Sequence, residues 1–171
     1  MKKIVLALVV MFSIGSVMAQ QKIGHVNSQK LLDTLPSRKA AIEQLRLFEE
    51  NGIQELQEME ADFNKQIAVY EKNRPTMSPV IIKIEEEKLM KKQQALQERE
   101  QSLNAEMQAV SQELNKPILE RVQKAVEIVS DRKKLSYVID ESTTLYFKGG
   151  MDITAEVIVE LLRLDAEATA K

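Results

Sequence analysis

The stretch Tyr70–Lys88, YEKNRPTMSPVIIKIEEEK, decides how the long helical part of this chain is arranged. It places Pro75 and Pro79 between two segments rich in Glu, Gln, Leu, Ala and Lys, which favour helices. The residue before a proline is disfavoured in a helix, so the first helix should end near Asn73. Ser78 before a proline is typical of a helix start, because serine caps exposed N–H groups and proline suits the first turn. The chain therefore forms either one kinked rod or two helices that turn back on each other.

Segment lengths favour the second alternative. Residues 37–73 and 80–116 are equally long, about 55 Å each at about 1.5 Å per residue, which two antiparallel helices require. We therefore predict a coiled-coil hairpin arm over residues 37–116, with its tip at residues 74–79. Gly52, within the first helix, costs about 1 kcal/mol relative to alanine. It is either a point where the arm bends or a tolerated defect.

The first nineteen residues have the pattern of a secretory signal peptide. Lys2 and Lys3 precede an apolar run over Ile4–Met18 and a small residue, which predicts cleavage before Gln20. The alternative is a membrane anchor, but the run is shorter than the roughly 20 residues that span a bilayer. We therefore expect an exported protein without this segment.

The net charge argues against one class of binding partner, and the cysteine content excludes disulfide bonds. The net charge is −2, and removal of Lys2 and Lys3 with the signal peptide changes it to −4. An acidic chain argues against nucleic acid as a partner, because phosphate contacts need an excess of Lys and Arg. The chain has no cysteine, so packing or assembly must stabilise the exported protein instead of disulfides.

Outside the arm the chain changes character. Period-two patterns predict strands at Lys22–Asn27, Leu135–Asp140 and Thr143–Phe147. Pro117 marks the expected boundary between the arm and a helix that packs on the sheet, and a last helix should open at Thr154, with Val157, Leu161 and Leu162 on its buried face. We predict an α+β fold with a discontinuous head over residues 20–36 and 117–171. Such a small head has bare sheet edges, so we expect it to self-associate.

Catalytic chemistry is not predicted. His25 is the single histidine, and no nucleophile or metal-ligand spacing accompanies it, so a structural or surface role is favoured. Asp140, Glu141 and Asp152 lie where acidic residues commonly serve turns and helix caps. The few glycines form no phosphate-binding loop. The sequence thus predicts no catalytic residue, no metal and no cofactor.

Three motifs resemble the Skp/OmpH family of periplasmic chaperones: IGHVNSQKLLDTLPSRKAAIEQL at 23–45, NKPILERVQKAVEIVSDRKKLSYVID at 115–140 and DITAEVIVELL at 152–162. The resemblance covers essentially the whole mature chain. It implies a periplasmic homotrimer in which strands of three subunits form a β-barrel head. It also implies that three arms surround a cavity, which shelters unfolded outer-membrane proteins without ATP.

Two sets of candidate residues follow. The resemblance implies an oligomer interface at Ile23, Val26, Tyr137, Ile139, Leu145 and Phe147. In the arm, an apolar seam faces polar Glu86, Gln93 and Glu100, which predicts incomplete packing near the tip. The candidate client-binding residues there are Met59, Phe63, Ile67, Tyr70, Met77 and Met90. Ordinary packing between the two helices is the alternative for this seam.

One departure from the family concerns charge. Better-known members are strongly basic, whereas both helices of this arm carry more acidic than basic residues. Contact with membrane or lipopolysaccharide is therefore left open. The predicted function is an ATP-independent holdase, with a structural coiled-coil protein of the cell envelope as the alternative.

Overall fold

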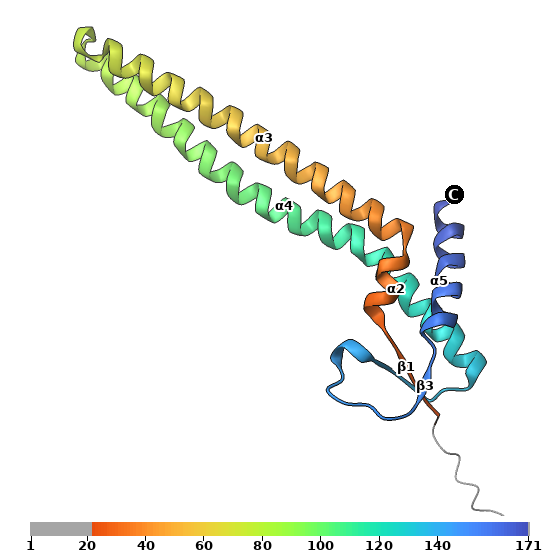
Figure 1. The fold of residues 1–171 in the computed structure, drawn as a ribbon. Helices are drawn as coiled ribbons and strands as arrows, with labels where there is room; N and C mark the ends of the chain where they lie inside the picture. The colour runs from red at the N-terminus through yellow and green to blue at the C-terminus, as the bar shows by residue number, and fades with distance from the viewer. Residues whose placement is uncertain (1–21, 171) are drawn as a thin grey trace, which may run out of the picture. The chain divides into compact units, whose positions relative to one another are not determined.

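The computed structural model describes residues 22–170, so the predicted signal peptide lies outside the described residues. The elements are β1 (Ile23–Val26), α2 (Ser28–Thr34), α3 (Pro36–Asn73), η2 (Arg74–Thr76), α4 (Pro79–Lys133), β2 (Tyr137–Asp140), η3 (Glu141–Thr143), β3 (Met151–Asp152) and α5 (Thr154–Thr169) (Figure 1). Two compact units result. The arm unit is Pro36–Glu120, and the described part of the head unit consists of residues 22–35 and 121–170.

The arm unit is a hairpin of α3 and part of α4 (Figure 1). Side-chain contacts join Tyr70 to Glu86, Asp62 to Lys92 and Glu55 to Arg99. Residue numbers fall along α3 as they rise along α4, so the two helices run in opposite directions. The prediction of a turn, as opposed to a kinked rod, is confirmed.

The tip forms as its prolines dictate. α3 ends at Asn73, a single 3-10 turn follows, and α4 begins at Pro79. The Ser78 hydroxyl accepts a hydrogen bond from the Ile81 backbone N–H at 3.4 Å, which is the expected capping contact.

Gly52 is a site of close approach between the two helices. It is buried, and an added β-carbon would lie under 3.0 Å from both δ-carbons of Leu103. Leu103 is itself buried. Gly52 therefore makes room for the Leu103 side chain of α4. The sequence had suggested either a bending point or a tolerated defect at Gly52, and neither of these included such a contact.

Pro117 does not end a helix, contrary to expectation. α4 continues through it to Lys133, 55 residues in all. A proline inside a helix removes one backbone hydrogen bond and costs about 3 kcal/mol. Helix-favouring residues on both sides and the burial of neighbouring Ile118 offset this cost.

The head sheet has the order β2-β1-β3, and both pairings are parallel. The strand expected at Thr143–Phe147 is wrong, because the chain turns there. The Asp140 side chain accepts the Ser142 backbone N–H at 3.1 Å, and the Thr144 hydroxyl donates to the Asp140 carbonyl at 2.8 Å. Such local bonds favour a turn over a strand. The third strand is instead Met151–Asp152.

Helices cover one face of this sheet. The core of the head unit consists of Val26, Leu31, Leu35, Ala125, Val129, Ile153, Val157 and Leu161. Leu31 lies within α2, and Leu35 directly follows this helix. The sequence patterns did not predict α2. α5 opens at Thr154 as predicted, but Leu162 is 38 % exposed and lies outside its buried face.

Along residues 22–170, every helix is too short or too polar to cross a membrane.

Candidate binding surfaces

The predicted seam of the arm lies between its two helices. Met59, Phe63, Ile67 and Tyr70 are all half-buried. Tyr70 donates a hydrogen bond through its hydroxyl to Glu86 at 2.6 Å. The structure therefore uses these residues at least partly for packing within the hairpin.

Incomplete packing is visible beside Phe63. An open hollow of about 350 Å³ lies between the helices and is lined by Glu60, Phe63, Asn64, Gln93, Leu96, Gln97 and Glu100. Two of these, Gln93 and Glu100, are polar positions of the second seam, where the sequence predicted poor complementarity. Phe63 and Leu96 thus present apolar surface to a partly solvated hollow.

Two ion pairs join the helices of the arm, and a third lies within α4. Lys92 pairs with Asp62, and this hydrogen bond holds the pKa of the Asp62 carboxyl below its ordinary value. Arg99 contacts Glu55 at 2.8 Å and Glu106 at 3.1 Å, and these hydrogen bonds raise its pKa. All five groups lie near the surface, so the pairs orient the helices more than they stabilise them.

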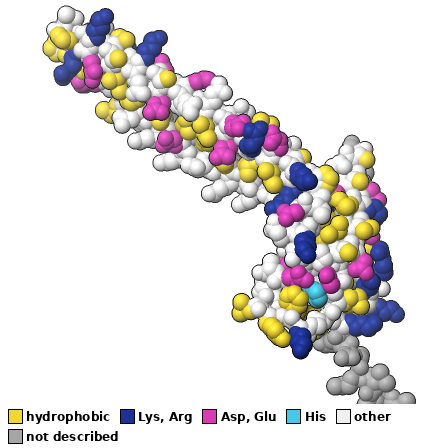
Figure 2. Space-filling view, viewed as in Figure 1, with side chains coloured by type: hydrophobic (Ala, Val, Ile, Leu, Met, Phe, Trp, Pro, Cys, Tyr) yellow, Lys and Arg dark blue, Asp and Glu magenta, His cyan; other side chains and the backbone are white. Residues whose placement is uncertain are grey.

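Exposed apolar side chains follow the arm (Figure 2). They are Ile42, Leu47, Ile53, Val69, Val80, Ile81, Ile84, Met90 and Leu119. Of the candidate residues, Met90 is 67 % exposed and Met77 is half-buried at the tip. Val80, Ile81 and Ile84 were missed, although the run VIIKI directly after Pro79 could have indicated them.

The head sheet has an exposed apolar face. Ile23 lies beside Tyr137, and Ile139 lies two pairs further along the sheet beside His25. Ile23, Tyr137 and Ile139 are all exposed, as are Leu145 and Phe147 in the segment before β3. Parallel sheets in soluble proteins are normally covered on both faces. In the single chain, this apolar face is open to solvent.

Val26 does not share this face. It is 5 % exposed and belongs to the core of its own head unit. The reason is the alternation of side chains along a strand. Gly24 and Val26 face the helices, whereas Ile23 and His25 point the opposite way. The expected interface set is thus split between the two faces.

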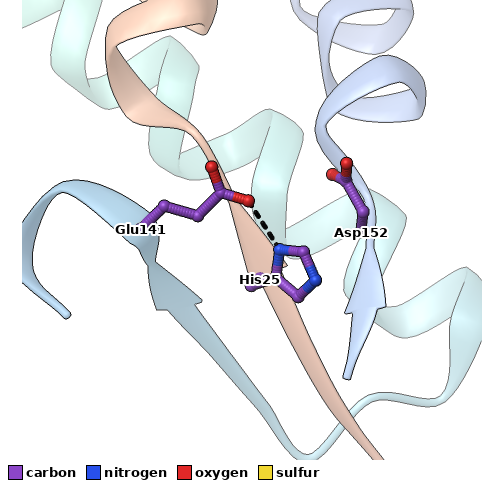
Figure 3. A group of neighbouring side chains, drawn as sticks. All are labelled: His25, Glu141 and Asp152. Atoms are coloured by element: carbon purple, nitrogen blue, oxygen red, sulfur yellow. Dashed lines mark hydrogen bonds and ion pairs between the residues drawn. The ribbon is translucent and has the colours of Figure 1, made fainter. Parts of the chain in front are cut away.

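His25 lies between two carboxylates (Figure 3). Its Nδ1 is 2.7 Å from Glu141 Oε1, and the Phe147 ring centroid is 4.9 Å from its own. Asp152 accepts the Thr154 backbone N–H at 2.9 Å, as expected of a cap. The side-chain hydroxyl and backbone N–H of Thr154 lower the pKa of Asp152.

Buried carboxylates of α5 were not anticipated from the sequence. Asp165 Oδ1 is 3.1 Å from Arg121 Nε, and Glu160 contacts Arg132 at 3.0 Å and Arg163 at 2.6 Å. Asp165 and Glu160 are both buried. Asp165 and Glu160 are spaced along α5 like the apolar residues of its buried face. The sequence did not indicate their burial, because charged residues in a helix usually lie on the face exposed to solvent.

Glu160 predicts an acid sensitivity of the head. Hydrogen bonds from Arg163 and Arg132 lower its pKa in the folded state. Its stabilisation is therefore complete above the ordinary glutamate pKa of 4.5 and is lost as the pH falls through the lower folded value. We expect the melting temperature to fall with acidification in this window, and to fall less steeply for Glu160→Gln. Circular dichroism melts across the window test this, and equal slopes for both proteins would contradict it.

Comparison with known proteins identifies the family. Residues 22–161 match the family model described as outer membrane protein (OmpH-like). The chain is 29 % identical over 150 residues to the chaperone protein Skp of Photorhabdus laumondii, covering 88 % of this chain and 90 % of that protein. It is 26 % identical over 140 residues to the Skp of Yersinia enterocolitica, covering 82 % and 85 %.

A solved structure shares the fold. The crystal structure of a putative outer membrane chaperone (OmpH-like) from Caulobacter crescentus superposes with a TM-score of 0.74 at 19 % identity, covering 87 % of this chain and 86 % of that one. The resemblance drawn from the three sequence motifs is thereby confirmed. The chain therefore belongs to the Skp/OmpH family.

Proposed function

We propose that this protein is an ATP-independent holdase that binds unfolded outer-membrane proteins in the periplasm and prevents their aggregation. The observation that carries the proposal is the row of exposed apolar side chains on the hairpin arm. Apolar side chains repeated along a helical arm can make many weak contacts with unfolded chains, as adaptable promiscuous binding surfaces do. The curated relatives are named chaperones, and chaperones are not enzymes, so we propose no catalytic activity.

The contact surface combines two groups of residues. Met90, Val80, Ile81 and Ile84 supply exposed apolar area at the tip half of the arm. Met59, Phe63, Ile67, Tyr70 and Met77 add the exposed parts of half-buried side chains, with Phe63 at the open hollow. Methionine adapts its shape to different partners, which suits a binder of varied sequences.

We propose a homotrimer assembled through the head. The exposed face of the parallel sheet at Ile23, Tyr137 and Ile139, together with Leu145 and Phe147, supports this assembly. A barrel of strands from three subunits would cover that face. Light scattering after size exclusion is expected to give three times the chain mass, and a monomer at micromolar concentration would contradict it.

The holdase proposal is tested by aggregation. An unfolded outer-membrane β-barrel protein is diluted from urea, and its light scattering is followed with and without this protein. We expect suppression at a stoichiometric ratio of trimer to client, without nucleotide. Full aggregation in the presence of a several-fold excess of trimer would contradict the proposal. Retention with envelope proteins combined with that failure would support a structural coiled-coil role.

A tip variant locates the contact surface. In Val80→Ser/Ile81→Ser/Ile84→Ser we expect client affinity to fall at least tenfold, because full burial of even one such side chain contributes about 1.5–3 kcal/mol and about 1.4 kcal/mol equals a tenfold change. Fluorescence anisotropy of a labelled client measures the dissociation constant. The matched control introduces three serines at exposed glutamines, Gln101→Ser/Gln108→Ser/Gln112→Ser. Equal loss in both variants would contradict a specific role of the tip.

A further inference from the structure

The three strands of the head sheet each deliver one metal-ligating side chain to the same edge. His25 comes from β1, Glu141 follows β2 directly, and Asp152 ends β3. The strands are parallel, so their carboxyl ends meet at one edge. One ligand atom from each residue lies within 4.8 Å of the other two (Figure 3).

Neighbouring groups orient both carboxylates. Glu141 accepts the Asn27 side-chain amide at 2.9 Å on Oε2, so its Oε1 faces His25 Nδ1. Asp152 accepts the Thr154 backbone N–H on Oδ1. The Thr154 hydroxyl in turn accepts the Asn27 backbone N–H at 3.1 Å. Such outer contacts hold metal ligands in place in known sites.

The imidazole is also enclosed. Phe147 lies against the ring, and a β-carbon added to Gly150 would be 3.2 Å from His25 Cδ2. Gly150 has φ of +100°, a conformation that other residues rarely adopt. The side chains of His25 and Glu141 are only 15 % and 20 % exposed. The ring is thus held in one place, with limited access to water.

The charge balance favours a cation. Two carboxylates converge on one imidazole, and one ligand atom from each of the three residues lies within 4.8 Å of the other two. A divalent ion would neutralise both carboxylates at a partly water-excluded position.

We propose that His25, Glu141 and Asp152 bind a divalent transition-metal ion of the Zn²⁺ type. An imidazole nitrogen with two carboxylates suits Zn²⁺, whereas Ca²⁺ and Mg²⁺ prefer oxygen ligands alone. Three protein ligands leave a coordination position for water. With metal bonds of about 2.0–2.2 Å, tetrahedral ligands lie roughly 3.3 Å apart. The 2.7 Å contact must therefore open and the 4.8 Å spread must close, both through small side-chain movements.

Bound metal would connect all three strands of the sheet. Because the ligands come from residues distant in sequence, the site exists only in the folded head, and binding stabilises that state. This inference does not depend on the holdase proposal, because no client is involved in the site or in its test.

The chain is well suited to a direct test, because it has one histidine and no cysteine. Untagged protein is stripped with a chelator and titrated with ZnCl₂ by calorimetry. We expect one equivalent per chain in the wild type, and at least tenfold weaker binding in His25→Gln and in Asp152→Asn. Glu113→Gln, an exposed acid of the arm, is the matched control and should bind as the wild type does.

A second readout separates ligation from a structural role. The ¹⁵N chemical shifts of the His25 ring report its state, and we expect zinc to shift Nδ1 while Nε2 keeps its proton. Circular dichroism establishes that each variant is folded. Unchanged zinc affinity in folded His25→Gln, or ring shifts that do not respond to saturating zinc, would overturn the proposal.

Discussion

Replacing Asp165 by alanine is expected to lower the free energy of unfolding by about 3–5 kcal/mol. Asp165 is 2 % exposed and pairs with Arg121, which joins α5 to α4 within the head unit. Removal of the carboxylate leaves a largely buried guanidinium without this counter-charge, and that loss exceeds the value of the intact pair. Urea denaturation followed by circular dichroism measures the change.

The control for Asp165 lies on the same helix. Glu167→Ala removes an exposed acid that pairs with Arg163, and a change of less than about 1 kcal/mol is expected. Arg121→Met/Asp165→Leu removes both charges and should recover much of the stability, because apolar replacements of a buried pair are often neutral. A loss of under 1 kcal/mol in Asp165→Ala would show that the pair is of little consequence.

The second large effect is expected in the arm, where Leu103→Ala should cost about 2–5 kcal/mol. Leu103 is 6 % exposed and fills the space above Gly52. The substitution leaves a cavity between α3 and α4, and these long helices can close it only partly. Denaturation of the full chain, monitored by helical circular dichroism, measures this loss.

Gly52 supplies the test of that contact. In the wild-type background, Gly52→Ala gains about 1 kcal/mol of helix propensity but forces Leu103 from its place, at a cost of about 1–3 kcal/mol. We therefore expect a neutral or destabilising effect. In Leu103→Ala, the same substitution should stabilise by about 1 kcal/mol, because the obstacle is gone. Additive effects in this double-mutant cycle would exclude the close approach.

The sequence predicted the arm well and the head only in part. Two prolines and the equal helical segments specify the hairpin, because helix ends depend on local chemistry. In the head, Thr143–Phe147 has strand propensity, yet Asp140 and Thr144 turn the chain by local hydrogen bonds. Strand propensity is overridden more easily than helix propensity, since it reflects the packing that a segment finds.

The candidate binding residues were likewise predicted only in part from the sequence. The seam residues from Met59 to Tyr70 follow from heptad spacing, and the structure places them between the helices. The exposed set at Val80, Ile81 and Ile84 lies off the seam, and only the packed hairpin shows which side chains stay outside. The family resemblance implied Val26 as an interface residue along with Ile23, but side chains alternate along a strand, and Val26 faces the core of its own head unit.

By itself, the sequence determined the family, the hairpin, its tip and the start of the last helix, because prolines, caps and periodic apolar residues act over a few neighbours. Tertiary structure decided which residues meet across long separations. It paired Gly52 with Leu103, Arg121 with Asp165, and His25 with Glu141 and Asp152. It also made the sheet parallel, with one face exposed. These features depend on the register of segments more than a hundred residues apart, which no local pattern in one chain encodes.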